Sequence, residues 1–428
     1  MLKRLELKNV GPSDSLEIDF APRVNLITGD NGLGKSFVLD LAWWALTRTW
    51  AHYPARPTNG KEATIAYTYD SANKEVTHTS SFSREAQEWR GKRGRPGLPG
   101  MVLYAQVDGS FSVFDPARNY WKTVPDRPPA YLFSPSEVWD GLSRRDSKDP
   151  SRTESLCEGL IRDWASWQGQ NGTAFDQLKS VLKKLSPAPA ESLVPGDLTR
   201  ISLGDVRDMP TLKMTYGADV AVVHASAAIR RVAALAYLLV WTWQEHKKAS
   251  KLLGGETTNE IIFLIDEVEA HLHPAWQRRI LRALMDVVAA LAESDQVKVQ
   301  IIAVTHSPML LASMEPVFDP EKDALWIFDL EEVDQHRHVQ LRRDDWHRRG
   351  DASAWLQSDI FDLGEARSVE AEEALTAARA FMQRNIAEPA EFQRLYELLR
   401  AAMPGDDPFW VTWRGWAWRH GLLDEKTP

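Results

Sequence analysis

The fold is decided by one short stretch, Gly29-Asp30-Asn31-Gly32-Leu33-Gly34-Lys35-Ser36. It fits the pattern G-x-x-x-x-G-K-S, follows the mainly apolar, strand-like stretch 24–28 and precedes a helix-like segment that begins at Phe37. In this pattern the glycines let backbone amides turn toward phosphate groups, and the N-terminus of the following helix adds a positive potential. The stretch therefore predicts a strand, a phosphate-binding loop and a helix, with residues 29–36 in contact with a nucleotide.

Two side chains of this Walker A loop have roles that follow from their chemistry. Lys35 is expected to reach the β and γ phosphates of ATP, and Ser36 is expected to ligate Mg²⁺. Asp30 and Asn31 are expected to shape the loop. ATP and Mg²⁺ are therefore the predicted cofactors.

A second segment combines an apolar run, residues 261–265, with the carboxylates Asp266 and Glu267 directly after it. Such a run is typical of a buried parallel strand that delivers acidic groups to its C-terminal edge. The pattern is that of a Walker B segment. Asp266 is predicted to hold Mg²⁺, directly or through water, and Glu267 to act as the general base toward the attacking water.

A third apolar run, residues 299–304, ends at Thr305 and His306. Because it follows the Walker B segment, His306 is predicted to contact the γ-phosphate or the attacking water rather than to have a purely structural role. Between these two runs, His271 and His273 lie close to the acidic segment. A metal site is one interpretation of this pair, and a loop that shapes a dimer interface is the favoured one.

The order of these motifs resembles that of the ABC-type ATPases of the RecF, SMC and OLD group, over roughly residues 1–50 and 212–330. The resemblance implies a P-loop NTPase fold of ABC type and a homodimer that holds ATP between two subunits. In this group a Ser-x-Gly signature opens a helix and contacts the ATP of the partner. The matching residues here are Ser226 and Ala228. Since Ala228 stands where the group has glycine, a weakened contact to the partner's ATP is expected.

Compact members of the group, the Septu-type and retron-associated ATPases, imply a role in bacterial anti-phage defence with a separate HNH-type nuclease as effector. No segment after His306 matches the TOPRIM nuclease domain of OLD proteins, so nuclease chemistry within this chain is not expected. Two alternatives remain open. One is a RecF-like repair ATPase that acts directly on DNA, and the other is a non-hydrolysing scaffold held together by ATP, which Ala228 keeps in consideration.

Strands that alternate with helices predict an α/β fold, with a largely parallel sheet, an antiparallel β-lobe and a helical insertion. The predicted division of the chain is residues 1–50 for the first part of the ATPase core, 51–135 for the β-rich lobe, 136–210 for the helical insertion, 211–330 for the second part of the core and 331–428 for a helical tail.

Composition limits the partners and the location. Acidic residues outnumber basic ones by 60 to 51, so any DNA contact must come from a local patch such as residues 90–95, which are read first as a solvated hairpin tip. The apolar runs are too short to cross a bilayer, and the start lacks a signal-peptide pattern. The single cysteine, Cys157, suits a reducing compartment, and the cytoplasm is the expected location. The tryptophan-rich stretch 409–419 is expected to pack rather than to stack on bases.

Overall fold

The computed structural model describes residues 1–58, 61–71, 74–90, 99–119, 128–146, 149, 151–291, 297–333, 336–384 and 388–423. The chain forms two compact units, Met1–Gly350 and Asp351–Pro428. The basic segment 90–95 lies outside the described residues except for Arg90, which ends a strand. In the part of the chain that is described, no helix combines the length and hydropathy needed to span a membrane.

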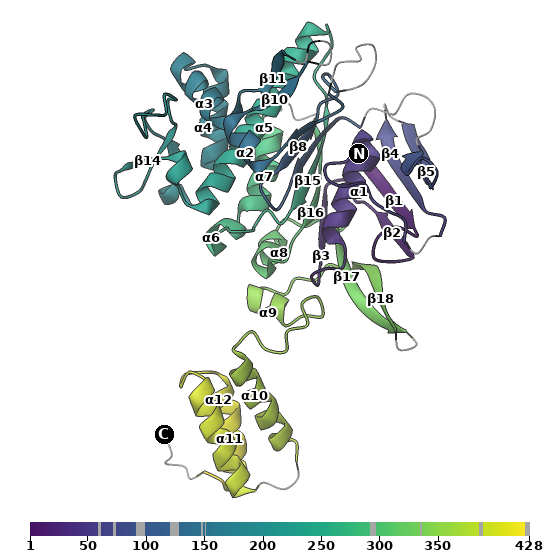
Figure 1. Cartoon of the computed structure of the whole chain (residues 1–428). Coiled ribbons are helices and arrows are strands. Elements are labelled where there is room, and N and C mark those ends of the chain that lie inside the picture. Colours follow the sequence, from purple (N-terminus) through teal and green to yellow (C-terminus); the bar gives the residue numbers. More distant parts are fainter. Residues whose placement is uncertain are drawn as a thin grey trace. The chain divides into compact units, whose positions relative to one another are not determined.

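The first unit is built on a mixed eight-stranded sheet with the order β18-β17-β3-β16-β15-β7-β8-β9 (Figure 1). The strands from β17 to β7 run parallel, and those at the two ends are antiparallel to their neighbours. The strands are β3 (Val24–Gly29), β7 (Met101–Ala105), β8 (Phe111–Phe114), β9 (Tyr131–Phe133), β15 (Glu260–Asp266), β16 (Lys298–Val304), β17 (Asp323–Val333) and β18 (His336–Asp344).

Both faces of the central strands are apolar, as expected for parallel strands in a sheet that is covered on both sides. In β15, residues 261–265 are at most 3% exposed. The register pairs Asp266 with Val304 and Val304 with Ile27, so the carboxyl ends of β15, β16 and β3 lie side by side. The three predicted motifs therefore leave the sheet at one edge.

A second, five-stranded antiparallel sheet has the order β2-β1-β4-β5-β6. Its strands are β1 (Leu2–Lys8), β2 (Ser15–Asp19), β4 (Thr64–Ser71), β5 (Lys74–Ser83) and β6 (Glu88–Arg90). Helix α1 (Lys35–Thr47) contacts β1 of this sheet and β3, β7, β15 and β16 of the large sheet. This double contact explains why α1 is apolar on most of its surface, including Trp43 and Trp44.

The remaining helices of the first unit lie mainly on the side of the large sheet opposite α1 (Figure 1). Helix α5 contacts α3, α4 and α7 there. The helices are α2 (Pro135–Asp140), α3 (Gly159–Gln170), α4 (Thr173–Lys184), α5 (Ala227–Leu252), α6 (Pro274–Gln277), α7 (Ile280–Leu291) and α8 (Pro308–Met314), with short 3-10 turns at Pro189–Glu191 and Val222–His224. Small strands complete the unit: β10 (Leu142–Arg145), β11 (Thr153–Cys157), β12 (Val194–Pro195), β13 (Thr211–Lys213) and β14 (Asp219–Ala221).

The second unit is helical and has its own core. It contains α9 (Ala352–Leu356), α10 (Val369–Met382), α11 (Pro389–Ala402) and α12 (Phe409–Arg419). Trp410, Trp413 and Trp416 are buried in this core, and Trp413 stacks on Phe392 with ring centroids 5.1 Å apart. The tryptophan-rich stretch thus packs mainly within its own unit, although Trp418 is 57% exposed.

The α/β P-loop fold, with a largely parallel sheet, an antiparallel lobe and inserted helices, is confirmed. The element assignment differs from the sequence prediction in three places. Residues 101–133 of the expected β-lobe form β7, β8 and β9 of the large sheet, because the run 101–105 is as buried as the other core strands. The expected helical insertion also contains the β10–β11 hairpin. The expected start of the tail at 331 falls within β17, which continues through a hairpin into β18.

Candidate functional site

The loop between β3 and α1 adopts a conformation that requires glycine at two positions. Gly29 has a φ of +126°, and a Cβ there would lie 2.0 Å from the carbonyl oxygen of Phe328. Gly34 has a φ of +97°, and a Cβ there would lie 2.7 Å from Pro12 Cγ. Both glycines are therefore fixed by backbone geometry and by close neighbours. The predicted phosphate-binding loop, residues 29–36, lies where the sequence placed it.

Helix α1 begins directly after this loop, with Gly34 as its N-cap residue. Because glycine has no side chain, it offers no acceptor for the first amides of the helix, which remain available to an anion. Lys35 is only 5% exposed, and its Nζ donates a hydrogen bond to the carbonyl oxygen of Asp30 at 2.5 Å. Burial lowers the pKa of Lys35, and the charges of Glu267, Asp30 and Asp266 oppose this shift.

Ser36 and Asp266 meet although they are far apart in the sequence. Ser36 Oγ donates to Asp266 Oδ1 at 3.0 Å. Burial raises the pKa of Asp266 to about 6, the hydrogen bond from Ser36 lowers it, and the charges of Glu267, Asp40 and Glu269 raise it further. The Ser36 hydroxyl and the Asp266 carboxylate are oxygen ligands of the kind that Mg²⁺ prefers. The nearby carboxylates also leave an excess of negative charge that a cation would balance.

Glu267 is held in an unusual backbone conformation, with a φ of +46°. Such a conformation costs free energy for a residue other than glycine and is common at functional sites. The Glu267 amide donates to the carbonyl oxygen of Val304 at 3.0 Å, and Glu267 Oε1 lies 3.4 Å from His306 Nε2. Burial and the neighbouring Lys35 lower the pKa of His306, so its imidazole is mainly neutral at pH 7. The two predicted catalytic side chains are thus adjacent.

Glu269 contributes to the site, and the sequence analysis did not assign it a role. Its Oε1 accepts hydrogen bonds from Thr305 Oγ1 at 2.5 Å and from the His306 amide at 2.9 Å. These bonds tie the segment after β16 to the segment after β15. The signal in the sequence is the position of Glu269, two residues after the catalytic candidate Glu267.

Arg231 and Gln106 were also missed. Arg231, on α5, donates to the carbonyl oxygens of Val107 at 2.6 Å and Glu267 at 3.0 Å, so it joins the loop after β7 to the loop after β15. Gln106 follows Ala105, which is paired with Ile265, and therefore lies at the same sheet edge as Asp266. Its side chain is 4% exposed and donates to Ser112 Oγ at 2.9 Å. Recognition of the strand 101–105 would have pointed to Gln106.

The signature-like residues are not brought to this edge within one chain. Ser226 is the N-cap of α5, and its Oγ accepts a hydrogen bond from the Ile229 amide at 3.3 Å. Ser226 is exposed and Ala228 is partly buried. In the described ranges, no hydrogen bond or ion pair joins either residue to residues 29–36.

Of the two histidines after β15, His273 has a local structural role. His273 Nδ1 accepts a hydrogen bond from the Ala275 amide and so caps α6, while His271 is exposed with a φ of +65°. Among the residues that the structure describes, no group of three or more His, Cys, Asp or Glu side chains is arranged to hold a metal ion.

Comparison with known proteins shows what this chain is similar to. A family model described as "AAA domain, putative AbiEii toxin, Type IV TA system" matches residues 24–312. Septu protein PtuA from Bacillus thuringiensis is 22% identical over 319 residues, which cover 73% of each chain. The SMC head domain from Thermotoga maritima aligns with a TM-score of 0.38 and 13% identity over 79% of this chain and 98% of that chain. An Smc head domain derived from Pyrococcus furiosus aligns with a TM-score of 0.37 and 13% identity over 80% of this chain and 96% of that chain.

Proposed function

Because this chain belongs to the family of AAA domains described as putative AbiEii toxins of type IV toxin–antitoxin systems, we propose that it binds and hydrolyses Mg-ATP. The observation that carries the proposal is the convergence of Lys35, Ser36, Asp266, Glu267 and His306 at the carboxyl ends of three adjacent strands. Ligands of α/β proteins bind at such edges.

Each group has a role that suits its surroundings. The amides of residues 29–36 bind the phosphates, and Lys35 moves from the Asp30 carbonyl to the β and γ phosphates. Ser36 and Asp266 would hold Mg²⁺, which would balance phosphate charge when bound. The positive charge of Mg²⁺ also favours the ionised form of Asp266 over the protonated form.

Hydrolysis requires a base close to the γ-phosphate. Glu267 orients a water molecule and accepts its proton as the water oxygen bonds to the γ-phosphorus and the bond to the ADP oxygen breaks. His306, whose Nε2 lies 3.4 Å from Glu267 Oε1, positions this carboxylate and contacts the γ-phosphate. The hydrogen bonds from Thr305 and the His306 amide to Glu269 hold the histidine in place.

A second copy of the chain is proposed to complete the site. The N-terminus of α5, with the exposed Ser226 and the partly buried Ala228, would approach ATP held by the other subunit. A helix N-terminus offers amides to a phosphate even where alanine replaces glycine. The active form is therefore a homodimer with two ATP molecules between the subunits, with looser closure than a glycine signature would allow.

The resemblance to Septu-type ATPases supports a role for this dimer as the nucleotide-controlled gate of an anti-phage defence complex in the cytoplasm. The similarity to Septu protein PtuA covers 73% of both chains and is consistent with such a role. The effector would be a separate nuclease of the HNH type. Direct action on DNA, as in RecF-like repair ATPases, is the alternative within the same ATPase class.

Two observations favour a second candidate, a scaffold that binds ATP without hydrolysing it. The Ser226 hydroxyl is already used to cap its own helix, and Ala228 replaces the glycine of the signature. Both features weaken closure over the partner's ATP. A scaffold of this kind would bind Mg-ATP and form the dimer, but it would release no phosphate.

Steady-state phosphate release by the purified chain tests the proposal. Wild-type protein is expected to show Mg-dependent turnover, and Lys35→Ala is expected to reduce it by at least about tenfold, because a charge-assisted contact to the phosphates is lost. Lys251→Ala, at an exposed lysine of α5, is the matched control. Equal turnover of Lys35→Ala and wild type would contradict the assigned site, and ATP binding without any turnover would favour the scaffold.

A further inference from the structure

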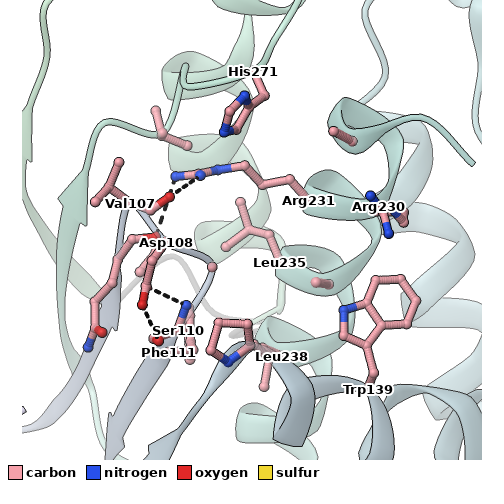
Figure 2. A pocket seen from close by; sticks show the side chains of 17 residues that line it. Val107, Asp108, Ser110, Phe111, Trp139, Arg230, Arg231, Leu235, Leu238 and His271 are labelled. Carbon is pink, nitrogen blue, oxygen red and sulfur yellow. Dashed lines mark hydrogen bonds between the residues drawn. The ribbon is translucent and has the colours of Figure 1, made fainter. Parts of the chain in front are cut away.

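A cavity of about 310 Å³ lies beside the proposed ATP site, between the loop after β7, helix α2 and the first half of α5, and its lining includes Gln106, Arg231 and Ala227. Figure 2 shows Leu235 and Leu238 of α5 and Trp139 of α2 among its apolar side chains, and Phe111 also lines it. The cavity is open at one side, and Trp139 is partly buried. Apolar walls that include one indole ring suit a planar hydrophobic group. None of these four residues belongs to the proposed ATP site.

The polar residues of this cavity give it an excess of positive charge. Arg230 and His271 are both exposed at its rim, and no hydrogen bond or ion pair engages the Arg230 guanidinium among the described residues (Figure 2). Among the described residues that line the cavity, the one acidic side chain is Asp108, which already accepts hydrogen bonds from the amide and hydroxyl of Ser110, each at 2.8 Å. An arginine without a partner next to an apolar wall is suited to the acidic group of a ligand.

We propose that this cavity binds a small amphipathic anion, a molecule with one planar hydrophobic ring system and one carboxylate or phosphate. The ring would lie between Trp139 and the leucines of α5, and the acidic group would pair with Arg230. The volume is at the lower end of the range of ligand pockets, which have mostly apolar walls and a few convergent polar groups. This composition favours a small molecule over a charged polymer, since most lining residues besides Arg230 and His271 are apolar and the polar ones among them are Gln106, Asp108, Ser110 and Arg231.

The cavity is connected to the proposed catalytic base through Arg231. This residue follows Arg230 on α5 and donates to the carbonyl oxygens of Val107, in the cavity wall, and Glu267. A ligand that moves Arg230 or the loop after β7 therefore changes the hydrogen bonds that hold the Glu267 backbone. The small anion acts as an effector of ATP turnover, and this part of the inference rests on the proposed function.

Binding is tested on the full chain without nucleotide, by isothermal titration and ligand-observed NMR, with 1-naphthylacetate as the probe. Its neutral isostere, 1-naphthylacetamide, is expected to bind roughly tenfold more weakly, because it lacks the charge that pairs with Arg230. Arg230→Ala is expected to weaken naphthylacetate by a similar, roughly tenfold factor and to leave the amide unchanged. Ala234→Leu, which fills the cavity from α5, is expected to weaken both probes.

Two controls separate this site from others. Arg282→Ala, at an exposed arginine of α7 outside the cavity, is expected to bind like wild type. Lys35→Ala is also expected to bind like wild type, which excludes capture of the anion by the phosphate-binding loop. The proposal is overturned if wild type shows no saturable binding, if acid and amide bind equally, or if folded Arg230→Ala or Ala234→Leu binds naphthylacetate like wild type.

The effector role has its own readout. Saturating naphthylacetate is expected to change the ATP turnover number of wild type by at least about twofold, which corresponds to a small change in barrier height, and to leave Arg230→Ala unchanged. Binding without any change in turnover would overturn the effector role while leaving the binding site intact. Absence of turnover in all variants would instead count against the proposed ATPase function, because the binding test does not depend on it.

Discussion

At the scale of single residues, the proposed ATP site contains buried ionisable side chains whose charged forms need the opposite charges of a bound ligand. Asp266 has its pKa raised to about 6, and Lys35 has its pKa lowered, in both cases chiefly by burial. Both pKa shifts disfavour the forms that the proposed site needs, which are the ionised carboxylate of Asp266 and the protonated amine of Lys35. Bound Mg²⁺ and phosphate would supply the missing opposite charges, so nucleotide binding is expected to stabilise this part of the protein.

Asp163 offers a residue-scale prediction that is independent of ATP. It lies on α3 and accepts a hydrogen bond from Tyr237 Oη at 2.7 Å, and burial raises its pKa from an ordinary value of 3.8 to about 6. Between these two values the folded protein binds a proton that the unfolded chain does not. The stability from this group is therefore present below pH 4 and is lost as the pH rises through 6.

Asp163→Asn removes this titration and keeps an acceptor for Tyr237. Its free energy of unfolding, relative to wild type, is expected to increase by about 2 kcal/mol from pH 4 to pH 8. Urea unfolding of both proteins at several pH values measures the difference. Asp176→Asn, at an exposed residue of α4 paired with Lys179, is the control and is expected to show little pH dependence. A difference for Asp163→Asn that is constant over this range would disprove the shift.

At this scale, the sequence predicted the site residues that belong to local motifs. Ser36, Asp266, Glu267 and His306 were proposed from motifs, and the structure brings them together. Arg231 could not be found in this way, because its role depends on backbone carbonyls of Val107 and Glu267, which are distant in the sequence. A long-range hydrogen bond to a carbonyl leaves no signature in the identity of the residue that accepts it.

At the scale of elements, α5 is the part that links the loops of the site. Arg231 on its first turns donates to carbonyl oxygens of the loops after β7 and β15. Arg231→Met, which keeps the length of the side chain but removes its donors, is expected to lower the turnover number roughly tenfold, because Glu267 loses orientation. The affinity for ATP is expected to stay within about threefold, since Arg231 makes no assigned contact to the nucleotide.

Steady-state kinetics and equilibrium binding of a fluorescent ATP analogue separate these two effects. Lys251→Met, at an exposed position near the end of the same helix, is expected to behave like wild type in both assays. A parallel loss of turnover and nucleotide affinity in Arg231→Met would indicate a general structural defect rather than a positioning role for this residue.

The strands were predictable where a long apolar run marks them. The run 261–265 and the run 299–304 gave β15 and β16 within one residue at each end. β7 was assigned to the wrong sheet because its run is short and is followed by antiparallel strands, which suggested a β-lobe. β18 was not recognised because most of its residues are polar or charged, so its sequence resembles a polar connection.

At the scale of the whole molecule, the chain has two units with separate cores. The tail was expected to begin at residue 331, but the first unit extends to Gly350. The polar residues after Leu330 did not suggest a strand, so the pairing of β17 with β18 was not predicted. Beyond that hairpin the described part of the second unit is helical, with α9, α10, α11 and α12. Separate cores imply that damage to one need not destroy the other.

Trp413→Ala tests this independence. Trp413 is fully buried against Phe392 in the second unit, and its removal is expected to cost roughly 3–5 kcal/mol, which is most of the stability of a small helical unit. Circular dichroism should show loss of helix, while Mg-ATP affinity stays within about threefold of wild type, because the ATP site lies in the first unit. Trp418→Ala, at a 57% exposed position of the same helix, is the control. A large loss of ATP affinity in Trp413→Ala would show that the units are coupled.

The central claim is that two copies of the chain close over ATP and that Glu267 drives its hydrolysis. Light scattering of Glu267→Gln with and without Mg-ATP tests it most directly, with phosphate release measured on the same samples and Glu256→Gln as an exposed control. The variant is expected to release phosphate at least about a hundredfold more slowly than wild type and to shift in Mg-ATP from the 48.4 kDa of one chain to twice that mass. A variant that stays a monomer in Mg-ATP and hydrolyses ATP as fast as wild type would contradict the account.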